Sequence, residues 1–313
     1  MASRRKAVKI KPTGPGAGQR LMGLARVAWR PCLIWVLPAA ALLAACLIGL
    51  NLSRAYVTAS PKYHVTAPKL EMPSPAPLWW EQAFEDQINQ SCDVANGMSI
   101  LDDSLLESIA AGYLRCPWVK RVRWVKKRFP GRISASIDLR EPAAAVAYNI
   151  GNGQRAYYLV ADDGVRLPKI YRHWRPRGLS VPFITGVGVN PPRPGQPWSE
   201  ASVADAIAIV ALLERSELIR TAVNITEVDV SNYRGRQRTT ESEFVLFAER
   251  NCRIIWGRAP NTVKPGELSV ARKIERLEEH LRRGDPVHNR ILNLRYPGPV
   301  VADRRYGPHA DGS

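Results

Sequence analysis

The side-chain types that most often perform catalysis are scattered along this chain of 313 residues. Its histidines have no acidic or thiol partner at a regular spacing; they are His64, His173, His280, His288 and His309. A serine nucleophile of the hydrolase type stands in a G-x-S-x-G elbow, and the sequence contains none. The Gly-rich segment 13–18 lacks both the G-K-[ST] of a phosphate-binding loop and a preceding strand. We therefore expect no catalytic residues and no cofactor.

Adjacent acidic residues occur at Asp102-Asp103, Asp162-Asp163 and Glu278-Glu279. General acid–base catalysis needs groups placed across a cleft, which neighbours in sequence do not provide. The first pair precedes an apolar run of helical period and predicts a helix cap. The second separates two strand-like runs and predicts a hairpin turn. The third belongs to the charged face of a helix.

The cysteines show no Cys/His spacing typical of a metal site, so we expect no metal. Cys32, Cys46 and Cys252 lie in apolar or strand-like segments, where a thiol serves as a small apolar side chain. Cys92 and Cys116 bracket a predicted helix. A disulfide between them would close a loop of 23 intervening residues and stabilise the fold by about 3 kcal/mol. Two unpaired buried thiols are the alternative.

An uncharged segment near the N-terminus, Pro31–Leu52, is long enough to cross a bilayer. Residues 1–30 carry eight Lys or Arg and no acid, so the positive-inside rule places them in the cytoplasm and residues 53–313 outside. A cleaved signal peptide or a lipidated Cys46 is the alternative. The apolar run is longer than the usual signal core of roughly 7–15 residues, which favours a transmembrane helix.

The net charge of +17 and the pI of about 10.0 favour anionic surfaces such as lipid headgroups, acidic partners or wall polymers. Such a pI in a cytosolic protein would suggest nucleic acid. The predicted topology argues against it for the large extracytoplasmic part, so we expect neither nucleic acid nor a small-molecule substrate. The basic tail at 1–30 is interpreted as an arm that sets topology, with lipid, protein or DNA binding as alternatives.

Residues 53–80 are rich in proline and predict an extended linker. Trp79-Trp80 then opens a helical pattern, either packed on the first folded module or lying at the membrane interface. Residues 81–147 predict a small α/β module with two helices and two strands. The second strand follows the turn at residues 129–131 and alternates cleanly, with one face formed by Ile133, Ala135, Ile137 and Leu139.

The first of these strands is strongly basic; its cations are Lys120, Arg121, Arg123, Lys126, Lys127 and Arg128. A solvated strand face is one interpretation. The other is a docking face for an acidic partner or the outer leaflet, centred on Lys120, Arg121 and Arg123. In either case, exposed charge discourages unwanted strand pairing.

Residues 148–302 predict a β-rich domain with two packed helices, over Glu200–Leu213 and Val270–Leu281. Its last strands are expected at Ile291–Arg295 and Val300–Ala302. Residues 303–313 are predicted to be a disordered tail. The fold class is therefore α+β: a transmembrane helix, a small α/β module and a β-rich domain.

Several segments resemble the FtsQ/DivIB family of single-pass bacterial division proteins, and they occur in family order behind the predicted anchor. These are Pro117–Val122 (PWV-x-x-V), Arg128–Pro130 ((R/K)-W-P), Arg140–Ala144 (REP-x-A), Tyr158–Val165 (LVD-x-x-G), Val181–Gly186 (LP-x-(I/L)-x-G) and the final strand Ile291–Tyr296. The resemblance covers roughly residues 98–301.

This resemblance implies a POTRA domain over residues 81–147 and a non-enzymatic scaffold at the division septum. It implies that the scaffold recruits FtsB/FtsL-type partners, with the partner adding a strand to the C-terminal strand of the β domain. The matching positions are Leu294, Arg295, Tyr296, Gly298, Val300 and Val301. Pro297 and Pro299 depart from the pattern because they remove main-chain donors. The family's apolar first POTRA strand is not clear in Pro61–Ala95.

The resemblance also implies a location in the bacterial cytoplasmic membrane, with the N-terminus in the cytoplasm and the bulk of the chain in the periplasm. Two alternatives come from other classes of protein. One is a membrane-anchored cell-wall enzyme or its accessory subunit. The other is a POTRA-type secretion component, for which repeated POTRA domains would be expected, and the sequence shows no internal repeat.

Overall fold

A computed structural model describes residues 17–65, 69–71, 79–91, 98–128, 131–174, 178–262 and 264–302. The start of the basic tail, most of the Pro-rich linker, Cys92, Phe129-Pro130 and the tail after Ala302 lie outside these ranges. The chain divides into two units, Met1–His64 and Val65–Ser313, which are described separately.

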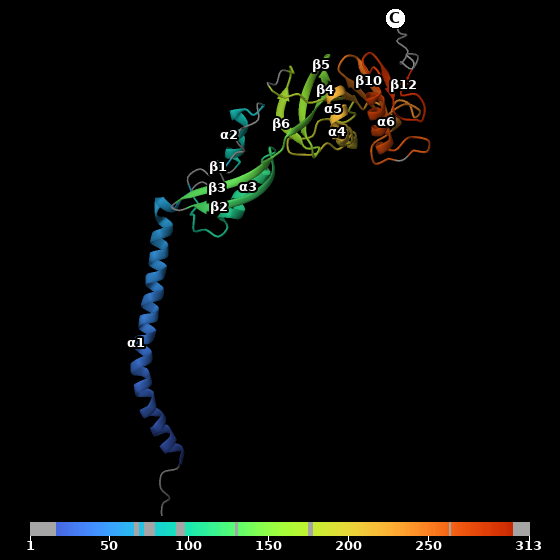
Figure 1. The fold of residues 1–313 in the computed structure, drawn as a ribbon. Helices are drawn as coiled ribbons and strands as arrows, with labels where there is room; N and C mark the ends of the chain where they lie inside the picture. Colours follow the sequence, from blue (N-terminus) through green and yellow to red (C-terminus); the bar gives the residue numbers. More distant parts are fainter. Residues whose placement is uncertain are drawn as a thin grey trace, which may run out of the picture. The chain divides into compact units, whose positions relative to one another are not determined.

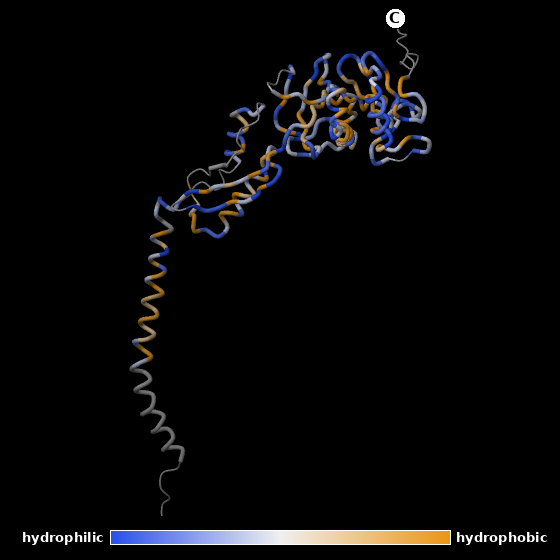
Figure 2. Tube along the Cα trace, in the orientation of Figure 1, coloured by the Kyte–Doolittle hydropathy of each residue, from blue (hydrophilic) through white to orange (hydrophobic). Residues whose placement is uncertain are grey.

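The first unit is dominated by one long helix, α1 (Ala17–Ala59), followed by the short 3₁₀ helix η1 (Pro61–Tyr63). Its segment Trp35–Val57 is long and apolar enough to cross a membrane, by length and composition, and none of it is buried by protein. Figure 2 shows this stretch as largely hydrophobic. The helix passes Pro38 and extends to Ala59, so residues 53–59, predicted as linker, are helical. No Pro or Gly occurs between Leu52 and Pro61 to end the helix earlier.

The second unit begins with a small α/β module. Its elements are β1 (Lys69–Glu71), α2 (Gln82–Gln90), α3 (Leu105–Arg115), β2 (Val119–Arg128) and β3 (Arg132–Leu139) (Figure 1). The strand order is β1-β3-β2, with β1 parallel and β2 antiparallel to β3. The predicted apolar face of β3 is buried at Ile133, Ala135 and Ile137 and half-buried at Leu139, but Ser134 of the predicted polar face is buried as well, so the alternation is only partly confirmed. A short strand, β1, occurs within Pro61–Ala95, where no strand is clear from the sequence.

An aromatic cluster joins α2 to the start of β2. The fully buried ring of Trp118 stacks on Phe84 at 4.3 Å between centroids. Trp79 and Trp80 both contact this pair, which confirms their predicted packing on the first module. The Trp118 indole donates a hydrogen bond to Gln87 Oε1 at 3.0 Å, so its buried N–H has a partner.

The rest of the unit is built on a nine-stranded sheet in the order β12-β11-β10-β9-β8-β7-β4-β5-β6. The strands are β4 (Pro142–Gly151), β5 (Gln154–Ala161), β6 (Arg166–Tyr171), β7 (Phe183–Thr185), β8 (Ile225–Asp229), β9 (Phe244–Ala248), β10 (Cys252–Gly257), β11 (Ile291–Asn293) and β12 (Val301–Ala302). Pro142 opens β4, a position where its missing N–H costs little. Residues 142–147 therefore belong to the large sheet, not to the small module.

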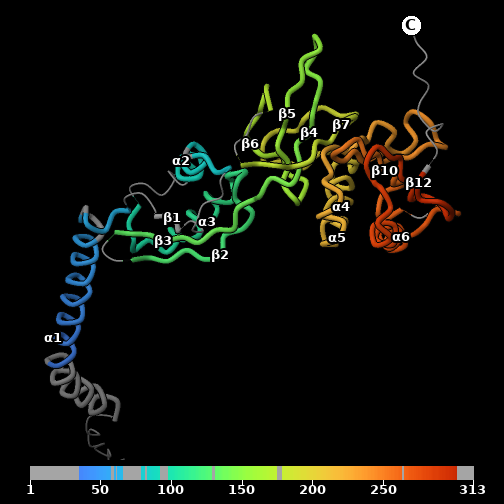
Figure 3. Tube along the Cα trace, turned by 45° about the horizontal axis from the view of Figure 1, so that its top comes forward, coloured from blue at the N-terminus to red at the C-terminus, as the bar shows by residue number. Residues whose placement is uncertain are grey.

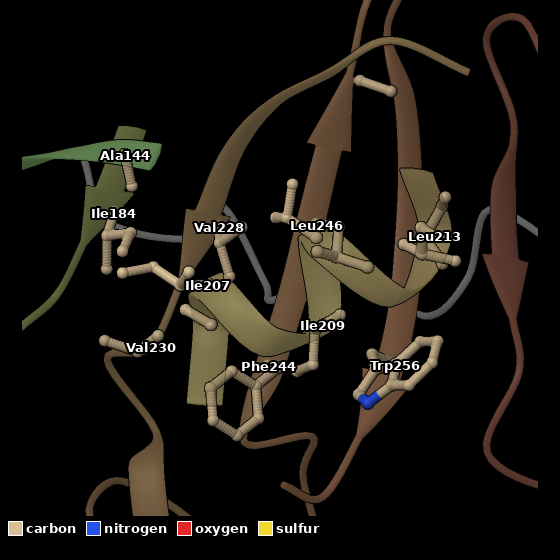
Figure 4. Packing of buried hydrophobic residues seen from close by; sticks show 14 of the residues in the cluster. Ala144, Ile184, Ile207, Ile209, Leu213, Val228, Val230, Phe244, Leu246 and Trp256 are labelled. Atoms are coloured by element: carbon tan, nitrogen blue, oxygen red, sulfur yellow. The ribbon is translucent and has the colours of Figure 1, made fainter. Parts of the chain in front are cut away.

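Three helices pack on the large sheet: α4 (Ala201–Glu214), α5 (Glu217–Ala222) and α6 (Val270–Arg282), while the 3₁₀ turn η3 (Tyr233–Gly235) follows β8. The predicted helices are confirmed as α4 and α6. Figure 4 shows Ile207, Ile209 and Leu213 of α4 among side chains of the strands, including Val228, Leu246 and Trp256. This apolar contact buries one face of the sheet and holds its strands in register.

A buried ion pair lies beneath α6. Lys273 Nζ is 2.6 Å from Glu267 Oε1, and the two side chains are only 3% and 5% exposed. The ammonium also sits 4.9 Å from the ring centre of Trp256, and Glu267 Oε1 accepts the Arg258 N–H. Burial lowers the pKa of Lys273. The charges are tolerated because each has a close partner.

We predict that Lys273→Met lowers the free energy of unfolding by about 3–5 kcal/mol, because Glu267 would stay buried without its cation. Guanidinium unfolding of the full chain in detergent, followed by tryptophan fluorescence, measures this. The control Glu275→Gln removes an exposed pair with Arg272 and should cost less than about 1 kcal/mol. A similarly small loss for Lys273→Met would show that the buried pair is unimportant.

Candidate partner-binding edges

The C-terminal end of the large sheet is the hairpin of β11 and β12, and Figure 3 shows β12 and β6 at opposite ends of this sheet. No strand in the described part of the chain pairs with the outer side of β12. The Asn293 N–H donates to Val300 O at 2.7 Å, which makes these two residues a hydrogen-bonded pair. In an antiparallel ladder the next pair, Leu292 and Val301, is then not hydrogen-bonded. Val301 therefore directs its N–H and C=O outward.

The strand behind β12 is firmly part of the core. Leu292 and Leu294 are fully buried, and the Leu294 N–H donates to Ile255 O of β10 at 3.1 Å. Leu294 was predicted to contact a partner, but its side chain and its N–H are both used within the fold. A strand added at this edge would therefore meet β12 and the turn before it, not Leu294.

The turn between β11 and β12 is held by α6. The Arg276 guanidinium donates to the carbonyl oxygens of Tyr296 and Gly298. Pro297 and Pro299 follow these two carbonyls and have no N–H of their own, so the turn has few main-chain donors. Arg276 supplies the hydrogen bonds that the two carbonyl oxygens need. The Tyr296 side chain remains 37% exposed beside the Arg295 guanidinium, 5.1 Å from its ring centre.

The main chain of Arg295 is held by two hydrogen bonds. Its N–H donates to Asn293 Oδ1 at 3.1 Å, and its carbonyl accepts the Leu268 N–H at 2.8 Å. Gly257 lies beneath it with φ +107°, and a Cβ there would meet Glu267 Oε1 at 2.0 Å and Arg295 Cγ at 3.0 Å. Only glycine fits this position. The sequence pattern at Arg295-Tyr296 could suggest the edge, but not this support from α6 and the preceding loop.

A second edge belongs to the small module, where the order β1-β3-β2 leaves β2 at the end of its sheet. The three predicted docking cations lie on it, and each has an internal partner. Lys120 pairs with Asp162 at 2.6 Å, while Arg121 and Arg123 share Asp138 across the β2–β3 ladder. Hydrogen bonds from Arg121, and secondarily from Arg123, hold the pKa of Asp138 below its usual value. Two guanidinium groups facing one carboxylate leave the face positive.

An open groove of about 490 Å³ runs between α3 and β2. Its apolar wall is formed by Leu106, Ala110 and Leu114, and the last of these is 56% exposed. Lys120, Arg121 and Arg123 line the opposite side. The groove thus has an apolar wall on α3 and a cationic wall on β2, which is an end strand of its sheet.

The paired acids Asp162 and Asp163 lie in the turn between β5 and β6, as predicted. They also connect the two folded parts of the second unit, which the sequence did not indicate. Asp163 accepts from Arg140 Nε at 2.8 Å, and Arg140 further donates to the carbonyls of Pro117 and Val119. One arginine at the end of β3 thereby ties the small module to the large sheet.

The described thiols are unpaired. Cys116 and Cys252 are buried and free, and Cys46 is exposed on α1. Cys92 lies outside the described residues, so its disulfide with Cys116 stays a prediction. Burial raises the pKa of Cys116 and raises the pKa of Cys252 to about 11. Both are therefore poor nucleophiles near neutral pH.

Among the described residues, no three His, Cys, Asp or Glu side chains lie together in an arrangement that could hold a metal ion. A scan against protein-family models finds no match, and no curated protein sequence matches the chain.

We predict that iodoacetamide labels Cys252 at pH 8 at least roughly 100-fold more slowly in the folded chain than in the unfolded chain, because a pKa of about 11 leaves only about one thiolate per thousand. Labelling should accelerate as pH rises toward 11, since deprotonation supplies the nucleophile. Peptide mass spectrometry measures both rates, with Cys252→Ser as the control. Equal rates in the folded and unfolded chain would contradict the burial of this thiol.

Proposed function

We propose that this chain is a non-enzymatic scaffold of the bacterial division machinery, similar to the FtsQ/DivIB family. It is anchored in the cytoplasmic membrane by α1, with the folded second unit in the periplasm at the septum. The succession of an apolar helix, a small α/β module and a large sheet supports this proposal, together with the family-like segments of the sequence. The basic residues before the apolar segment Trp35–Val57 support the orientation.

The small module is proposed to be a POTRA domain. The element order β1, α2, α3, β2, β3 supports this assignment, because it provides a three-stranded sheet against two helices. Its groove between α3 and β2 is proposed to contact an acidic segment of another division protein. Apolar contacts with Leu114 and main-chain bonds to β2 would supply affinity, and the cations would select an acidic partner.

The observation that carries the proposal is the outward main chain of Val301 on β12. An FtsB-type partner would add a strand there, extending the nine-stranded sheet by one. Tyr296, Gly298 and Val300 adjoin this edge, and Arg276 fixes their turn in place before a partner arrives. A preformed turn reduces the ordering cost of binding. Leu294 and Arg295 support the edge from within the fold.

We predict that Val301→Pro weakens binding of an FtsB-type partner about tenfold or more. The substitution removes the outward N–H without removing a hydrogen bond to β11, and a lost main-chain bond at a buried interface costs about 1–3 kcal/mol. Affinity measured by biolayer interferometry on the full chain in detergent tests this.

The matched control is Val301→Ala, which keeps the N–H and should stay within about threefold of the original affinity. If both variants bind alike, or if Val301→Ala loses as much as Val301→Pro, the partner does not use the main chain of β12. An unchanged unfolding midpoint for Val301→Pro confirms that the hairpin survives.

In cells, a fluorescent fusion of the full chain should gather at the septum, and depletion should give filaments that fail to divide. Fluorescence microscopy of dividing cells measures both. A uniform membrane signal with normal septation would refute the proposed division role, whatever partner binds in vitro.

A further inference from the structure

The opposite end of the large sheet has a different chemistry. Four aromatic rings meet there: Tyr157 of β5, Tyr171 of β6, Phe183 of β7 and Trp174 just after β6. Trp174 lies against the other three with ring centres 5.7, 5.4 and 5.0 Å away from Tyr157, Tyr171 and Phe183. Tyr157 and Tyr171 are direct cross-strand partners, so both rings stand on the same face of the sheet.

An open pocket of about 550 Å³ lies at this cluster, lined by Tyr157, Arg172, His173 and Trp174. Its volume falls within the roughly 300–1,000 Å³ typical of small-molecule sites. Arg172 and His173 are exposed, and within the described part of the chain neither has an acidic partner. The pocket thus offers ring faces with one fixed cation and one imidazole beside them.

The start of β6 at this end of the sheet is already covered. The Arg166 N–H donates to Gln196 O, and Arg166 O accepts the Gly195 N–H, so a loop already covers the start of β6. Pro168 has no N–H to offer. Lys169 is engaged with Glu81 at 2.8 Å. The covered start of β6 and Pro168 leave only a short stretch of main chain for an extended peptide, so side chains offer the larger recognition surface.

We propose that this pocket, the Trp174 pocket, binds a glycan that carries a carboxylate. The C–H bonds on a pyranose face carry slight positive charge, which suits the negative faces of aromatic rings. A carboxylate on the sugar complements Arg172, whose planar guanidinium can donate two parallel hydrogen bonds to it. Nucleobases also stack on such rings, but the proposed periplasmic location excludes them as the natural ligand.

The test uses the full chain in detergent and two disaccharides as probes. One is N-acetylglucosaminyl-N-acetylmuramic acid, which has a carboxylate; the other is chitobiose in its N,N′-diacetyl form, which is neutral. Saturation-transfer NMR should detect both, with the carboxylated sugar bound about fivefold more tightly. Arg172→Gln should abolish this preference and leave chitobiose binding within about twofold.

Trp174→Ala should weaken both sugars about tenfold or more, while Trp174→Phe, which keeps a ring, should retain most of the affinity. Arg220→Gln, which removes an exposed arginine of α5, is the matched control and should change neither affinity. Binding that is absent, that survives Trp174→Ala, or that is exceeded by an oligothymidine or an acidic peptide would overturn the proposal. No division partner is present, so failure here leaves the proposal for β12 standing, and failure at β12 leaves this one standing.

Discussion

Main-chain hydrogen bonding at the ends of the large sheet is the constraint on which the rest of the molecule depends. A strand at the end of a sheet leaves one row of N–H and C=O groups without a protein partner. At β6 that row is occupied by residues 195–197 and interrupted by Pro168. At β12 it is not occupied by any described strand. The same sheet therefore has one end whose edge is partly covered and one end able to accept a strand.

The interactions around β12 explain how this short strand keeps a fixed position at the edge of the sheet. Within the described residues, two residues of β12 pair with β11, which is too little to fix the position of the strand alone. Arg276 of α6 holds the turn from one side, and the parallel pairing of β11 with β10 holds it from the other. α6 in turn is seated by the buried pair of Lys273 and Glu267. Helix α6 therefore connects the buried ion pair to the position of the β11–β12 turn.

Much of this architecture follows from local sequence. Short-range patterns in the sequence predict the helices α4 and α6, the strand β3 and the acidic turn before β6. β1 could not be predicted because its three residues have no pattern of their own and pair with β3, more than 60 residues later. The roles of Lys273 and Leu294 were also hidden. Lys273 lies on a helix, so the sequence predicts a solvent-exposed side chain; its burial follows only from its ion pair with Glu267. Leu294 lies near the sheet edge, so the sequence predicts a partner contact; its place in the core follows only from its bond to β10.

Residue-resolved amide hydrogen exchange in the full chain, without any partner, tests the central claim most directly. The Val301 N–H points away from β11, so it should exchange nearly as fast as an unstructured amide. The Leu294 N–H, bonded to Ile255 O inside the core, should exchange orders of magnitude more slowly. If Val301 is protected as strongly as Leu294, the edge of β12 is already occupied, and strand addition there is excluded.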